Sequence, residues 1–213
     1  MNAREVKELI RQEKLVPILR TNTAEPILDL AKAVVEAGGK IIEYTTTIKG
    51  IISEIGKVKD HYPDLVIGLG TVYNKEEALE AIRNGVDFIN TPILNYNIVD
   101  TVKSQDKLLL LSGFTPTEIY NAHIAGADMV KLFPASEMSP TFIGELKGPM
   151  PFVDIFPTGG LDLISAIQFL AHGSFAVGMG STLFKKSLIE NKNYNEITRL
   201  VENVIRRLKN MAI

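Results

Sequence analysis

The sequence of 213 residues predicts one α/β domain over residues 1–213, a (β/α)8 TIM barrel with an extra helix before the first strand. Short apolar runs alternate with longer amphipathic stretches up to the end of the chain. No linker or low-complexity segment interrupts this alternation, and the length suits a single filled core. Eight βα units in so short a chain imply parallel strands that close into a barrel.

The elements follow one another in a regular order. Residues 1–14 are charged and form an amphipathic pattern, with Val6, Leu9 and Ile10 on the inner side of a predicted helix. Eight short apolar runs then predict the strands. These runs span residues 15–19, 41–45, 66–70, 88–90, 108–112, 129–133, 153–156 and 175–177.

Capping residues predict where the helices between the strands begin and end. Asn74, Asp162 and the pair Thr115-Pro116 are typical starts, because Asn, Asp and Thr cap the first N–H groups and Pro is tolerated in the first turn. Glycines after the amphipathic stretches indicate helix ends. They are Gly38, Gly85, Gly126 and Gly173.

A doubly wound open sheet is the alternative fold. It would place a glycine-rich fingerprint, GxGxxG, after the first strand. The sequence at that point is Arg20-Thr21-Asn22-Thr23, which contains no glycine. The barrel is therefore favoured.

The composition excludes several functional classes. The formal net charge is −2 and the basic residues are scattered, which argues against a nucleic-acid partner. There is no cysteine, so disulfides, thiolate catalysis and thiolate metal sites are excluded. The N-terminus lacks the apolar core of a signal peptide, and no apolar run is long enough to span a membrane. We expect a cytoplasmic protein.

Lys131 is the most informative single residue. It lies inside the apolar run 129–133, where the sequence reads Met-Val-Lys-Leu-Phe. Burial disfavours the charged form of an ammonium group and lowers its pKa, so the free amine can attack a carbonyl and form a Schiff base. The alternative is a lysine on an edge strand whose head reaches solvent.

Polar residues gather at the carboxyl ends of the predicted strands, where barrels of this kind carry their active sites. Strand alternation puts Lys131 and Phe133 on one face, and Glu43 and Thr45 on one face. A carboxylate inside a barrel is costly unless it is paired, so we expect Glu43 to interact with Lys131 or another cation. Further residues at strand ends are Arg20, Thr71, Thr91, Pro92, Thr115, Thr158 and Ser181.

Two glycine-rich segments follow the seventh and eighth strands, at residues 157–162 and 178–181. In TIM barrels the loops after these strands often bind phosphate through exposed backbone N–H groups. The alternative is that these are ordinary turn glycines. Their two positions favour a phosphate site.

Ordered motifs along nearly the whole chain resemble the 2-keto-3-deoxy-6-phosphogluconate (KDPG) aldolase family, also known as 4-hydroxy-2-oxoglutarate aldolases. The resemblance implies a class I aldolase that uses no metal or cofactor, forms homotrimers and cleaves a phosphorylated 2-keto acid to pyruvate and glyceraldehyde 3-phosphate. The matching segments lie at 16–20, 42–45, 68–72, 91–92, 115–118, 130–135, 148–149, 156–160 and 177–181.

The resemblance also assigns roles to individual residues. Lys131 would form the Schiff base, and Glu43 would act as general acid and base. Arg20 and Thr71 would hold the substrate carboxylate, and Pro92 and Phe133 would line the pyruvyl pocket. The phosphate would lie against Gly159, Gly160, Gly180 and Ser181, with Thr45 and Thr158 as further substrate contacts.

One position departs from the family pattern. Some members carry an arginine two residues after the threonine of the Glu-x-Thr motif, where this chain has Thr47. Carboxylate binding would then depend on Arg20, with Lys49 as a weaker substitute because it lacks a planar fork. The stereochemistry at C4, and hence a gluconate or galactonate substrate, and the use of unphosphorylated 4-hydroxy-2-oxoglutarate stay open.

Two functions of other classes also stay open. A phosphate-binding isomerase or epimerase would use the same glycine loops, but it typically needs a carboxylate pair or a metal. A sugar-phosphate binding module would bind phosphate without catalysis. The three histidines have no spacing that indicates a metal site; they are His61, His123 and His172.

Overall fold

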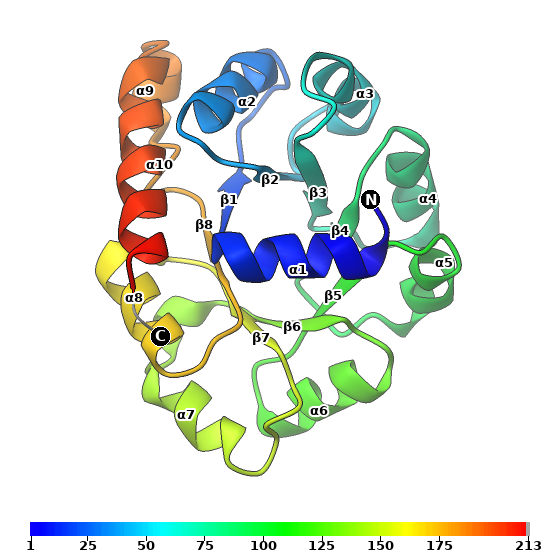
Figure 1. The fold of residues 1–213 in the computed structure, drawn as a ribbon. Helices are drawn as coiled ribbons and strands as arrows, with labels where there is room; N and C mark the ends of the chain where they lie inside the picture. The colour runs from blue at the N-terminus through cyan, green and yellow to red at the C-terminus, as the bar shows by residue number, and fades with distance from the viewer. Residues whose placement is uncertain (212–213) are drawn as a thin grey trace.

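The computed structural model describes residues 1–211, in which eight parallel strands form a nearly closed barrel surrounded by helices (Figure 1). The strands are β1 (Leu15–Leu19), β2 (Ile41–Thr45), β3 (Val66–Gly70), β4 (Phe88–Asn90), β5 (Leu108–Ser112), β6 (Met129–Leu132), β7 (Ile155–Pro157) and β8 (Val177–Met179). The order is β7-β6-β5-β4-β3-β2-β1-β8, and a parallel bridge between Thr158 and Gly178 joins the two ends. The predicted TIM barrel is confirmed.

Helices follow the strands and cover the outside of the barrel (Figure 1). They are α1 (Ala3–Glu13), α2 (Ile27–Glu36), α3 (Ile51–His61), α4 (Lys75–Arg83), α5 (Val99–Lys103), α6 (Pro116–Ile124), α7 (Thr141–Lys147), α8 (Leu163–Ala171), α9 (Lys186–Glu190) and α10 (Tyr194–Lys209), with 3-10 turns η1 (Tyr96–Ile98) and η2 (Ala135–Glu137). Within residues 1–211, none of these helices combines the length and the apolar character that crossing a membrane requires.

Side chains on alternate positions of each strand build two separate cores. Inward-facing residues such as Val66, Phe88 and Met129 fill the lower part of the barrel, and their neighbours in sequence pack against the surrounding helices. The inner core stops below the carboxyl ends of the strands. Polar inward positions occupy that level instead, which leaves room for a site there.

Helix α1 lies across one opening of the barrel, as Figure 1 shows. Asn2 caps it by accepting a hydrogen bond from the backbone N–H of Glu5. Val6 and Ile10 are fully buried in the inner core, and Leu9 is half-buried against it. The predicted N-terminal helix and its inward face are confirmed.

The residues predicted to start and end helices have the expected capping geometry. The side chains of Asn74, Thr115 and Asp162 each accept a hydrogen bond from the N–H three residues later. The glycines predicted to end helices all have left-handed backbone conformations that other residues adopt only with strain. They are Gly38, Gly85, Gly126 and Gly173.

The predicted bounds of β1 to β5 are confirmed, but the last three strands differ. Strand β6 ends one residue earlier. Strand β7 starts at Ile155 because the apolar Val153 belongs to the preceding turn, where its N–H donates to the carbonyl of Met150. Strand β8 is shifted to 177–179 and includes Gly178. A Cβ at Gly178 would lie 2.6 Å from Cδ1 of Ile18, so this glycine allows close packing inside a strand rather than a turn.

Candidate active site

Lys131 is on β6 and faces the barrel interior. Only 6% of it is exposed, and its neighbours in the sheet register are Ser112 and Phe156. Its Nζ atom lies 4.9 Å from the centroid of the Phe133 ring. Burial lowers the pKa of Lys131; the carboxylate of Glu43 raises it in part, and the charge of Arg20 lowers it further. The predicted burial of this lysine is confirmed, and the solvent-facing alternative is wrong.

Glu43 enters the same interior from β2 and is 1% exposed. Its Oε2 accepts a hydrogen bond of 2.8 Å from Nδ2 of Asn90 on β4. Burial raises the pKa of Glu43, while the charge of Lys131, the Asn90 hydrogen bond and the charge of Arg20 each lower it. The two groups therefore shift in opposite directions: the amine is easier to deprotonate and the carboxyl is easier to protonate. This is the arrangement that nucleophilic and acid–base chemistry at neutral pH needs.

A cavity of about 340 Å³ connects these two residues with the carboxyl ends of the strands. It brings together eleven of the twelve residues that the sequence predicted for the site. They are Arg20, Glu43, Thr45, Thr71, Lys131, Phe133, Thr158, Gly159, Gly160, Gly180 and Ser181. Pro92 does not line the cavity, and neither does Lys49, which lies in a groove beside α2 and α3.

The two glycines in the loop after β7 are required by packing as well as by their backbone angles. Gly159 and Gly160 have φ values of +96° and +74°. A Cβ at Gly159 would lie 2.9 Å from the Phe133 ring, and one at Gly160 would lie 2.6 Å from the Cβ of Ser136. No turn or loop hydrogen bond within residues 1–211 uses the N–H of Gly159, Gly160 or Ser181. These N–H groups can therefore donate to an anion at the mouth.

Threonines occupy the side of the cavity near β2 and β3. Thr71 has a left-handed φ of 65°, unusual for a β-branched residue, and its carbonyl accepts a hydrogen bond of 2.7 Å from the Thr46 hydroxyl. The hydroxyls of Thr45 and Thr47 are 2.7 Å apart. Thr47 is exposed and does not line the cavity. Arg20 is the guanidinium available to a substrate carboxylate here.

The model of the family described as KDPG and KHG aldolase matches residues 6–200. The chain belongs to this family. A 2-dehydro-3-deoxy-phosphogluconate aldolase of Haemophilus influenzae is 32% identical over 206 residues, which cover 96% of this chain and 97% of that protein. A 2-dehydro-3-deoxy-6-phosphogalactonate aldolase of Escherichia coli is 30% identical over 173 residues, covering 80% of this chain and 84% of that protein.

Solved structures of KDPG-type aldolases share the fold. The native structure of a protein named KDPGal has a TM-score of 0.83 at 26% identity and covers 90% of this chain and 92% of its own. The KDPG aldolase of Legionella pneumophila has a TM-score of 0.85 at 23% identity, covering 93% and 97%. Pyruvate was captured in that protein as a covalent carbinolamine. The predicted family, and with it the expectation of a pyruvate aldolase, is confirmed.

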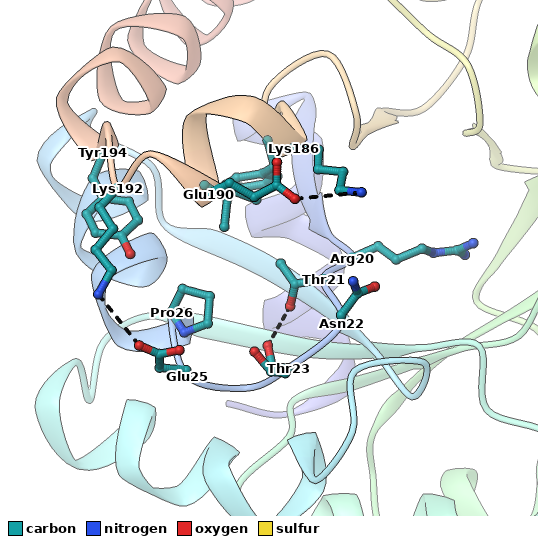
Figure 2. A pocket seen from close by; sticks show the side chains of 12 residues that line it. Arg20, Thr21, Asn22, Thr23, Glu25, Pro26, Lys186, Glu190, Lys192 and Tyr194 are labelled. Atoms are coloured by element: carbon teal, nitrogen blue, oxygen red, sulfur yellow. Dashed lines mark hydrogen bonds and ion pairs between the residues drawn. The ribbon is translucent and has the colours of Figure 1, made fainter.

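A second cavity of about 400 Å³ lies beside the first in this aldolase, between the loop after β1 and helix α9 (Figure 2). It contains neither Lys131 nor Glu43, but it shares Arg20, Phe184 and Lys186 with the first cavity. Most of its charges are paired: Lys186 with Glu190 along α9 at 3.6 Å, and Lys192 with Glu25 at 3.7 Å. Figure 2 shows Arg20 extending away from these pairs.

Sequence reasoning missed four residues of the aldolase site. Asn90 could have been found, because it is a polar residue at the carboxyl end of a predicted strand, like Glu43 and Thr71. The other three gave no signal: one is an apolar strand residue and two lie around the start of α9, and residues of these types in such places are typical of packing or solvent exposure. They are Ile18, Phe184 and Lys186.

Two glycines on β3 make room for buried side chains of the neighbouring strands. Gly68 and Gly70 both face inward; a Cβ at Gly68 would collide with the ring of Phe88, and one at Gly70 would collide with Oε1 of Glu43 and lie 2.9 Å from its Cδ. The side chain of Glu43 thus crosses β3 above Gly70 to reach Asn90. Gly68 is therefore required by the packing of the inner core, and Gly70 by the position of Glu43.

Replacing Gly70 with alanine is expected to lower kcat by roughly 100-fold. The added Cβ would displace Glu43, and a small displacement of a reacting group lowers the rate steeply. Gly56→Ala is the matched control, since a Cβ there meets only Asn84 at 3.9 Å and the position is helical. It should leave kcat unchanged and maintain or raise the melting temperature. The measurement is steady-state pyruvate release, with circular dichroism melts of both variants. Equal kcat in both variants would contradict the role given to Gly70.

Proposed function

We propose that this protein is a class I aldolase that cleaves 2-keto-3-deoxy-6-phosphogluconate to pyruvate and glyceraldehyde 3-phosphate through a Schiff base on Lys131. The observation that carries the proposal is the buried Lys131 amine, with its lowered pKa, in one cavity with the buried carboxyl of Glu43. A free amine is the nucleophile that a class I mechanism requires.

The reaction follows from the two side chains. The Nζ of Lys131 attacks the C2 carbonyl of the substrate, and loss of water gives an iminium. Glu43 takes the proton of the C4 hydroxyl while the C3–C4 bond breaks, and the iminium accepts the electron pair as an enamine. Glu43 then returns a proton to C3. Hydrolysis of the resulting iminium releases pyruvate and restores the amine.

The remaining cavity residues match the two charged ends of such a substrate. Arg20 and Thr71 offer a guanidinium and a hydroxyl to the carboxylate. Backbone N–H groups of Gly159, Gly160 and Ser181 offer donors to the phosphate at the mouth, with Lys186 beside them. Thr45, Thr158 and Gly180 complete the walls of the cavity. We propose no substrate contact for Pro92.

A galactonate substrate is the second candidate, because the relative from Escherichia coli named as a phosphogalactonate aldolase is almost as similar as the one from Haemophilus influenzae. The two substrates differ only at C4, whose hydroxyl faces Glu43 in the proposed mechanism. Cleavage of unphosphorylated 4-hydroxy-2-oxoglutarate is a side activity we also expect. From the family resemblance we further propose a cytoplasmic homotrimer.

Borohydride reduction in the presence of pyruvate is expected to leave a stable adduct on Lys131 alone, located by peptide mass mapping. Comparing kcat/KM for the gluconate, the galactonate and the unphosphorylated substrate then ranks the three substrates. Absence of any adduct in the folded protein would refute the Schiff-base mechanism. An adduct with cleavage of the galactonate only would keep the mechanism and change the substrate.

A further inference from the structure

Asn90 is a buried polar residue whose side chain leaves one hydrogen-bonding atom without a partner. Its side chain is fully buried, and Nδ2 donates to Glu43 at 2.8 Å. Its Oδ1 is also buried, and within residues 1–211 no donor reaches it. A buried acceptor without a donor costs free energy that an apolar side chain at this position would avoid. The asparagine therefore serves something other than packing.

The surroundings of Glu43 indicate a role for the Asn90 side chain. The side chain of Glu43 passes over Gly70 and ends against Asn90, so it spans the inner face from β2 to β4. In the sheet register Gly70 on β3 pairs with Asn90 on β4, whereas Glu43 on β2 pairs with Gly68, two residues before Gly70. Gly70 leaves space without directing the carboxyl group. Asn90 is the residue that donates a hydrogen bond to one of its oxygens.

A general acid–base residue needs a partner in both of its protonation states. As a carboxylate, Glu43 can only accept a hydrogen bond, whereas the protonated acid also donates one. A side-chain amide carries a donor and an acceptor that exchange places when its terminal torsion turns by about 180°. The free Oδ1 of Asn90 is thus the acceptor that the protonated acid would use.

We propose that Asn90 is a positioning residue that holds Glu43 in one orientation through both protonation states. It donates from Nδ2 to the carboxylate and accepts at Oδ1 from the acid. This inference rests on the proposed function, because only a residue that gains and loses a proton in each turnover needs such a partner. Asn90 touches Glu43 and acts through it.

The groups around Glu43 set the direction in which its pKa is expected to change when Asn90 is replaced. Lys131 on β6 and Arg20 after β1 both favour its ionised form, as does the hydrogen bond from Asn90, while burial opposes it. Removing the Asn90 donor therefore raises the pKa of Glu43. The acid limb of the kcat/KM profile contains the deprotonation of both Glu43 and Lys131 in the free enzyme, and the part set by Glu43 moves to higher pH.

Asn90→Leu and Asn90→Asp test the proposal in the full-length enzyme. In Asn90→Leu, kcat for cleavage of the phosphorylated substrate should fall about 10- to 100-fold, the effect of losing a hydrogen bond to a charged group, with little change in KM. Asn90→Asp keeps the shape of the side chain, but two adjacent carboxyls retain a shared proton. Both variants should move the acid limb to higher pH.

Asn95→Leu is the matched control. Asn95 is also buried, follows the same strand and donates to the carbonyl of Tyr73, not to Glu43. Its variant can lose stability but should keep the acid limb of the parent enzyme. An equal displacement in Asn95→Leu, or an unmoved limb with kcat within twofold in Asn90→Leu, would overturn the proposal.

Pyruvate trapping separates this proposal from the proposed function. The parent enzyme and both Asn90 variants should form the borohydride-stable adduct on Lys131. If they do and the pH profile of the variants is unchanged, only the role of Asn90 fails. If the parent enzyme forms no adduct, the Schiff-base function itself fails.

Discussion

Replacing Lys131 with alanine is expected to reduce cleavage of the phosphorylated 2-keto acid by about 10⁴-fold or more, since its buried amine is the one proposed to form the iminium. The side chain is 6% exposed, and its removal leaves the Phe133 ring and the inner core in place. The fold should therefore persist. The measurement is steady-state pyruvate release, together with borohydride trapping and peptide mapping.

Lys147 provides the matched control for this experiment. Burial also lowers the pKa of Lys147, but the side chain lies outside the cavity, and its Nζ donates to the carbonyl of Val153 at 2.5 Å. Lys147→Ala should cost stability and leave kcat within about twofold, as expected away from an active site. A Lys131→Ala enzyme with near-parent activity, or an adduct found on Lys147, would show that the nucleophile has been misassigned.

Replacing Glu43 with glutamine is expected to lower kcat by about 10²–10⁴-fold, the usual contribution of a positioned general acid–base group. Glutamine keeps the length of the side chain and an oxygen that can accept the hydrogen bond from Asn90. Packing above Gly70 is therefore preserved while proton transfer by this side chain is lost. A decrease of less than tenfold would assign proton transfer to another group.

The same variant should change how imine formation depends on pH. The carboxylate of Glu43 raises the pKa of Lys131, so its loss lowers that pKa further. The free amine then appears at lower pH, and the rise of pyruvate trapping with pH shifts downward. Arg20→Gln should shift it upward, because the guanidinium lowers the pKa of Lys131. Shifts in the same direction for both variants would contradict the electrostatic coupling described here.

The barrel could be predicted from the sequence because each strand is a short apolar run between strong helix signals. The prediction of strand bounds was wrong where one residue type occurs both in strands and in turns. Gly178 looks like a turn residue and lies in β8, because Ile18, Thr158 and Phe156 approach its backbone too closely for any Cβ. Val153 looks like a strand residue and lies in a turn.

The site was predictable to a similar extent and for a similar reason. A lysine or glutamate in an apolar strand is conspicuous, so Lys131 and Glu43 could be found from their context. Asn90 could be found as a polar residue at a strand end, but its hydrogen bond to Glu43 across β3 could not be predicted. Contacts between strands distant in sequence depend on the register, which the residues alone do not specify.

Helix α1 has a consequence for the order in which products leave. Val6 and Ile10 close the barrel at the end opposite the cavity, and the inner core fills the space between. The mouth beside Gly159 and Gly180 is then the route in and out. In the proposed mechanism pyruvate is attached to Lys131 deep in the cavity, so the aldehyde lies between it and solvent and must depart first. Turnover by this mechanism would be sequential at the exit: hydrolysis of the covalent intermediate completes the cycle only after the outer half of the cavity has emptied.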